Sequence, residues 1–87
     1  MKEITIRCTG ISSMAQMHDT LARELNFPEW YGRNLDALHD CLTGISEETR
    51  LTFLHFPALP FPTAGLLLVL RDSENENPHL EISFVTN

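Results

Sequence analysis

The chain has few basic residues and few cysteines. Its 87 residues include 6 Lys and Arg against 12 Asp and Glu, which gives a formal net charge of −6 with neutral histidines. Nucleic-acid binding requires a basic face that contacts phosphates, so this composition argues against DNA or RNA and favours a basic partner. Cys8 and Cys41 lie in apolar patterns without metal-ligand spacing. We therefore expect two buried thiols, with no disulfide scaffold, no metal and no cofactor.

Long hydrophobic runs are also missing. The longest uninterrupted apolar run covers residues 66–70, whereas a membrane-spanning helix needs about 20 apolar residues. Glu3 and Arg7 interrupt the start of the chain, which is not typical of a signal peptide. We therefore expect a cytoplasmic protein without membrane contact. The 43% of apolar and 21% of charged residues are typical of a globular chain, and the length fits a single domain over residues 1–87.

The spacing of apolar residues predicts three strands and three helices. The strands are expected over 2–8, 51–56 and 80–85, and the helices over 13–26, 34–43 and 63–73. Ser13, with Gln16 three residues later, and Asn34 are expected to cap the first two of these helices. The uniformly apolar second strand is expected to be buried on both faces. Helices that separate the strands predict an α/β domain with a small three-stranded parallel sheet in the order β-α-α-β-α-β. The prolines within 57–62 predict an irregular segment before the last helix.

The expected helix over 34–43 carries two aspartates on one face. Asp36 and Asp40 are four residues apart, and like charges at this spacing cost about 0.2–0.5 kcal/mol. Asp40 also lies near the C-terminal end, where the helix dipole disfavours an anion. Trp30 and Tyr31 precede this helix, and aromatic side chains beside fixed carboxylates are typical of a surface that anchors a protein partner. The alternatives are a solvated helix face and aromatic rings packed into the helix junction.

The remaining polar residues give no sign of catalysis. Asp36 and Asp40 could form an acid/base pair, but no nucleophile, phosphate-binding loop or further carboxylates accompany them. We therefore expect that the chain is not an enzyme. His18 and His79 are expected at the surface, and His55 is expected to be a core histidine of the second strand.

Residues 28–44, PEWYGRNLDALHDCLTG, resemble the core motif of the barstar family. Its members are small intracellular inhibitors of microbial ribonucleases such as barnase. The resemblance extends along nearly the whole chain in the order of elements, with further matches at 17–21 and 69–72. It implies a barstar-like fold and an acidic antitoxin or immunity protein that is a monomer when free. The implied partner is a basic secreted or toxin ribonuclease.

The resemblance also implies which residues bind. In the family, the second helix and the loop before it block the ribonuclease active site. Asp40 corresponds to an acid that occupies the phosphate pocket, Asp36 to an acid that meets basic groups, and Trp30 to an aromatic residue that contacts the catalytic histidine. The other implied contacts are Tyr31, Asn34, His39, Thr43, Gly44 and Asp72. The alternative is a non-inhibitory interaction module on the same fold.

Three positions depart from the best-known member of the family. His39 and Ile45 stand where that member has large aromatic residues, and Arg33 replaces an acid in the loop. These positions lie on or near the implied contact surface, so they bear on which ribonuclease is recognised. The local charge still favours a basic partner, because residues 29–48 contain five acids and only one base, Arg33.

Overall fold

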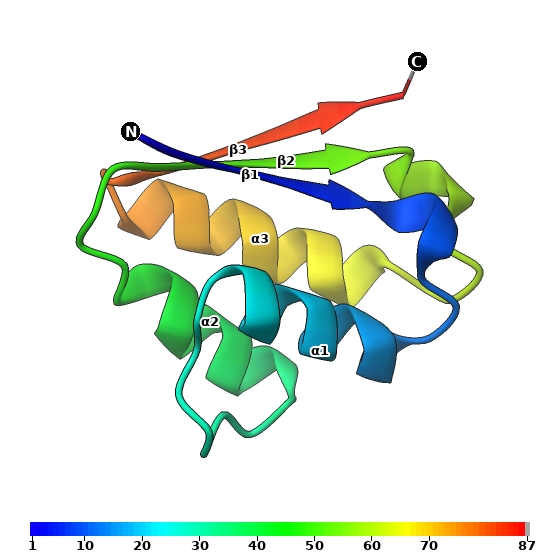
Figure 1. Ribbon diagram of the computed structural model, residues 1–87, viewed down its shortest axis with the longest axis horizontal. Helices are drawn as coiled ribbons and strands as arrows, with labels where there is room; N and C mark the ends of the chain where they lie inside the picture. The colour runs from blue at the N-terminus through cyan, green and yellow to red at the C-terminus, as the bar shows by residue number, and fades with distance from the viewer. Residues whose placement is uncertain (87) are drawn as a thin grey trace.

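Three parallel strands form one sheet, and three helices lie on one side of it (Figure 1). The computed structural model describes residues 1–86. The strands β1 (Lys2–Arg7), β2 (Thr49–Leu54) and β3 (Leu80–Val85) are ordered β1-β2-β3. The helices are α1 (Met14–Glu24), α2 (Leu35–Thr43) and α3 (Ala64–Glu76). This β-α-α-β-α-β order confirms the expected α/β fold with a three-stranded parallel sheet.

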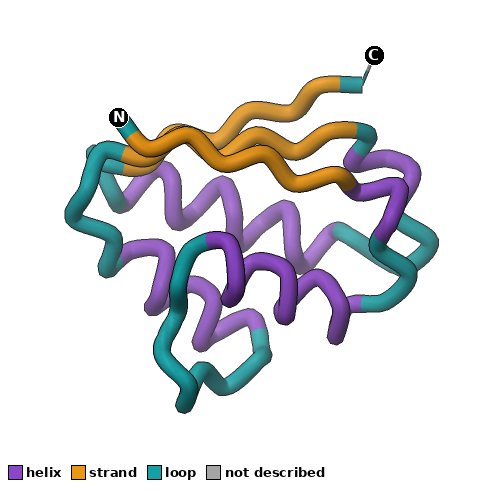
Figure 2. The backbone as a smooth tube through the Cα atoms, in the orientation of Figure 1, coloured by secondary structure: helices purple, strands orange, loops and turns teal. Residues whose placement is uncertain are grey.

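Burial alternates along the strands because the helices cover only one face of the sheet (Figure 2). On the covered face, Ile4 pairs with Leu51, which pairs with Ile82, and all three are buried. The residues between them along the strands point to the open face. The expectation that the second strand is buried on both faces is therefore wrong, since its alternate side chains are half-buried. It also begins two residues earlier than expected and ends at Leu54.

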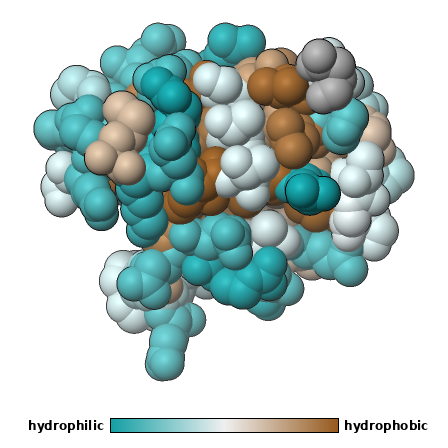
Figure 3. Space-filling view, turned by 45° about the horizontal axis from the view of Figure 1, so that its top comes forward, coloured by the Kyte–Doolittle hydropathy of each residue, from teal (hydrophilic) through white to brown (hydrophobic). Residues whose placement is uncertain are grey.

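The open face of the sheet is largely polar. Arg50 lies between the carboxylates of Glu3 and Glu81, at 3.2 and 3.4 Å. Thr5, Thr52 and Ser83 form the next row across the strands. Figure 3 turns this side toward the viewer and shows hydrophilic and near-neutral surface interspersed with smaller hydrophobic areas.

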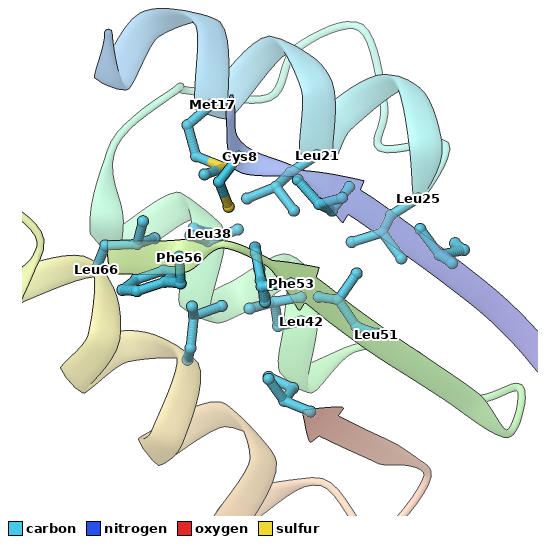
Figure 4. Packing of buried hydrophobic residues seen from close by; sticks show 14 of the residues in the cluster. Cys8, Met17, Leu21, Leu25, Leu38, Leu42, Leu51, Phe53, Phe56 and Leu66 are labelled. Atoms are coloured by element: carbon cyan, nitrogen blue, oxygen red, sulfur yellow. The ribbon is translucent and has the colours of Figure 1, made fainter. Parts of the chain in front are cut away.

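All three helices contribute to one hydrophobic core against the covered face of the sheet. Figure 4 shows how their side chains converge on β2. The fully buried members of this core include Met17, Leu21, Leu38, Leu42, Leu51, Phe53, Leu66 and Leu70. Since α2 inserts only Leu38 and Leu42 completely, its remaining faces are left for α3, for the preceding loop and for solvent.

The ends of α1 fix where the next loop begins. At its start, Oγ of Ser13 accepts a hydrogen bond from the backbone N–H of Gln16, as the spacing predicted. At its end, Asn26 adopts a left-handed conformation with φ of 57°, and the N–H of Phe27 donates to the carbonyl of Ala22 at 2.9 Å. This arrangement stops the helix and turns the chain sharply into the loop over 26–34.

The third helix is longer than the apolar pattern predicted. It was expected to end at Ser73 but continues through Glu76. It ends there because Asn77 precedes Pro78 and is extended, as residues before proline prefer to be. The expected irregular segment over 57–62 is confirmed, with a short 3-10 turn at Phe56–Ala58. The expectation for His55 is wrong, since it follows β2 in a left-handed conformation and is only half-buried.

Candidate functional site

The second helix lies on the side of the molecule away from the sheet (Figure 1), and both of its aspartates are exposed. Asp36 and Asp40 point outward, and the Asp40 side chain is 86% exposed. Among residues 1–86, Asp36 has no ion-pair partner. Within the same described range, the one ionisable partner of Asp40 is the imidazole of His39, whose Nδ1 lies 3.9 Å from Oδ1 of Asp40. These two charges are therefore available to a partner.

The start of α2 is held by a side-chain cap and a close loop. Oδ1 of Asn34 accepts a hydrogen bond from the N–H of Ala37 at 2.8 Å, which confirms the expected N-cap. A Cβ at Gly32 would lie 3.2 Å from Nδ2 of Asn34 and 3.4 Å from Cβ of Ala37. Glycine therefore lets the loop pack closely here. Arg33, the basic departure from the family motif, forms an ion pair with Asp19 of α1, so its charge is directed away from α2.

The other end of α2 is fastened by Asn77, which sequence reasoning missed. Its buried amide donates to the carbonyls of Leu42 at 2.8 Å and Ile45 at 2.9 Å. Its Oδ1 accepts the N–H of His79 at 2.9 Å. One side chain thus joins the end of α2 to the turn between α3 and β3. The signal in the sequence is an Asn before a proline, which favours the end of a helix. This signal does not indicate which groups the Asn77 side chain binds.

The two aromatic residues of the loop have opposite placements. Trp30 is 83% exposed, whereas Tyr31 is 8% exposed and its hydroxyl lies 2.6 Å from Nδ1 of buried His18. Burial raises the pKa of Tyr31 to about 12. Burial, reinforced by the charge of Arg33, lowers the pKa of His18 below its usual 6.5. The expectation of a surface position for His18 is wrong, because the tyrosine hydroxyl gives the imidazole a partner inside the protein.

A hollow of about 450 Å³ lies between this loop and α2. Its walls include Trp30, Tyr31, Gly32, Asp40, Cys41 and Ile45. Burial and the nearby Asp40 charge raise the pKa of the Cys41 thiol, which leaves the thiol protonated. The expected burial is confirmed for Cys8, whereas Cys41 is only half-buried at this hollow. The site therefore offers an aromatic ring and a carboxylate around an apolar depression, without a reactive thiol.

A further pair of acids from α3 joins the aspartates of α2. Asp72 and Glu76 are exposed on α3, four residues apart. His39 of α2 contacts Glu76 and lies within reach of the charge of Asp72. Nε2 of His39 is 2.6 Å from Oε2 of Glu76. We call Asp36, His39, Asp40, Asp72 and Glu76 the acidic patch. Glu76 was missed because the third helix was expected to end earlier, although its spacing from Asp72 would have placed both on one face.

The other expected contact residues are less exposed or already engaged. Oγ1 of Thr43 donates to the carbonyl of His39 at 2.8 Å, so it is turned back onto its own helix. Gly44 is exposed and its N–H donates to the carbonyl of Asp40 at 3.1 Å. Within residues 1–86, no group of three or more His, Cys, Asp or Glu side chains is arranged to hold a metal ion. In the same range, no helix has the length and hydrophobicity to cross a membrane.

The fold and the site define a small α/β protein that presents an acidic helix and an aromatic loop. The model of the family described as "Barstar (barnase inhibitor)" matches residues 1–84, so this chain belongs to the barstar family. The chain is also similar to the "Putative ribonuclease inhibitor YrdF" of Bacillus subtilis (strain 168), with 50% identity over 44 residues. That match covers 51% of this chain and 48% of the relative, so it spans about half the length of each.

Proposed function

We propose that this chain inhibits a basic, barnase-like ribonuclease by inserting α2 and the loop over 26–34 into its active site. Family membership and the name of the relative support an inhibitor of this class. The observation that carries the mechanism is the position of Asp40, which is fixed on a short helix, is 86% exposed and has no Arg or Lys beside it among residues 1–86. We infer that this carboxylate takes the place of a substrate phosphate.

The physical reason is charge complementarity. A ribonuclease active site is cationic because it binds a phosphodiester, and carboxylates form short, strong hydrogen bonds with arginine. Asp36, Asp40, Asp72 and Glu76 place four acids on the two adjacent helices. Their combined field would steer a basic enzyme toward this surface and raise the rate of association.

The loop supplies the apolar part of the interaction. Trp30 lies at the hollow and exposes most of its ring, and tryptophan is among the residues that contribute most to protein interfaces. Tyr31 is an expected contact residue, but it is buried. In this proposal it supports binding indirectly, because its hydrogen bond with His18 holds the loop in place. Preorganisation of this kind reduces the entropy lost on binding.

The test is inhibition of a panel of basic microbial ribonucleases, barnase included, by the parent chain and by Asp40→Ala. Loss of a hydrogen-bonded charge costs about 1.5–3 kcal/mol, so we expect a ten- to hundredfold weaker inhibition. Glu81→Ala is the matched control, because it removes the same charge from the open face of the sheet. Equal inhibition by Asp40→Ala and the parent would refute the phosphate-mimic mechanism.

The cellular setting follows from the same proposal. We place the inhibitor in the cytoplasm as a monomer over residues 1–87, acting as an antitoxin or immunity protein against a ribonuclease that is secreted or delivered. A non-inhibitory interaction module on the same fold is the alternative function. It is favoured if no ribonuclease of the panel is inhibited while a native cell extract yields a partner that Asp40→Ala no longer captures.

A further inference from the structure

A histidine lies at the centre of the acidic patch. Nε2 of His39 is 2.6 Å from Glu76, and its Nδ1 is 3.9 Å from Asp40. Asp72 of α3 also faces this imidazole, and Asp36 lies one turn earlier on α2. The His39 side chain is 33% exposed, so protons can exchange with the solvent. Every charged group that acts on it from α2 and α3 is an acid.

These carboxylates stabilise two different cations. They favour a proton on His39, and they are the groups that would meet Arg and Lys of a basic enzyme. A bound cationic partner and a protonated His39 would repel each other and draw on the same negative charge. The hydrogen bond to Glu76, followed by the charges of Glu76, Asp40 and Asp72, raises the pKa of His39 in the free chain, which agrees with this picture.

We propose that the His39–Glu76 pair couples the binding of a cationic ribonuclease to the release of a proton, so that the inhibitor binds less tightly as the pH falls. The inference rests on the proposed function. Binding would lower the pKa of His39 relative to the free chain. Affinity then decreases as the pH drops through the pKa of His39 in the free chain, and it levels off below the pKa of His39 in the complex. Each pKa unit by which the two states differ weakens binding tenfold at low pH.

The experiment compares dissociation constants for one inhibited ribonuclease at about pH 8 and about pH 6, on either side of a titrating imidazole. The parent chain and His39→Gln are measured with the same enzyme, so that titrating groups of the enzyme cancel. We expect the dissociation constant at the lower pH, divided by that at the higher pH, to be about three- to tenfold larger for the parent than for His39→Gln. Calorimetry in buffers of different ionisation enthalpy should also show more proton release with the parent than with His39→Gln.

A second histidine–glutamate pair provides the matched control. Nδ1 of His79 lies 2.6 Å from Oε1 of Glu48, and this pair joins the turn before β3 to the loop before β2, outside the acidic patch. His79→Gln should therefore keep the pH dependence of the parent. Glu76→Gln should reduce the pH dependence, and it provides a second variant if His39→Gln unfolds.

The outcomes separate the two proposals. Inhibition with the same pH ratio for the parent, His39→Gln and Glu76→Gln would overturn this inference and leave the proposed function intact. Inhibition of no ribonuclease at either pH would overturn the proposed function and the inference with it. A loss of pH dependence in His79→Gln equal to that in His39→Gln would also overturn the inference, because the effect would then not come from the acidic patch.

Discussion

Removal of the Tyr31 hydroxyl should destabilise the fold measurably. In Tyr31→Phe, Nδ1 of His18 loses the hydroxyl that lies 2.6 Å away. Tyr31 and His18 are 8% and 5% exposed, so water cannot readily replace the lost partner. A buried polar atom left without a hydrogen bond costs about 1–3 kcal/mol. For a domain of this size, that corresponds to a fall in melting temperature of at least about 4 °C.

The assay is urea unfolding followed by circular dichroism, because the fluorescence of exposed Trp30 should change little on unfolding. The double variant His18→Leu/Tyr31→Phe is the control. It removes both polar partners together, and it should be more stable than Tyr31→Phe alone. An unfolding free energy of Tyr31→Phe within about 0.5 kcal/mol of the parent would refute the reasoning, since a satisfied buried hydrogen bond cannot be lost at so little cost.

Two further expectations concern the same framework. Asn34→Ala removes the N-cap of α2 and should lower the free energy of unfolding, measured with urea, by about 1 kcal/mol. Asn34→Asp should retain most of the stability of the parent, because aspartate is also a good N-cap. Equal stability of Asn34→Ala and the parent would contradict a stabilising role of the cap. Burial lowers the pKa of His18 in the folded chain, so below about pH 6.5 the unfolded chain binds the proton more readily and stability falls with the pH. Urea unfolding should show this loss of stability at low pH, and the loss should be smaller in His18→Leu than in the parent. An equal loss in His18→Leu and the parent would exclude His18 as its source.

The secondary structure could be predicted from the sequence because its signals are local. Alternating apolar residues marked the first strand, and helical spacing with Ser13 and Asn34 as caps marked the first two helices. The acidic helix was also placed correctly, since its position depends on local spacing. The sequence left open whether Trp30 is exposed or packed into the helix junction, and the structure shows that it is exposed. The family resemblance over residues 28–44 identified the same segment, which agrees with the local signals.

The contacts between elements could not be predicted in this way. His18 lies on the edge of the apolar face of α1, and its burial depends on Tyr31, which is 13 residues away. Glu76 and Asn77 reach α2 from 37 and 35 residues away along the chain. A polar residue is expected at the surface unless its partner is known, and a partner that comes from a distant element leaves no periodic signal in the sequence.

The acidic helix is stabilised by groups that do not neutralise its charge. Asp36 and Asp40 repel each other, and Asp40 opposes the helix dipole. The stabilising contacts are instead the neutral cap of Asn34, the amide of Asn77 and buried leucines. A lysine beside Asp40 would stabilise the unbound protein, but it would form an ion pair with the carboxylate that a partner needs. The surface thus keeps its carboxylates free at a cost in stability, as expected where binding and stability make opposite demands. Asp40→Ala should accordingly weaken binding while leaving the free energy of unfolding unchanged or slightly higher.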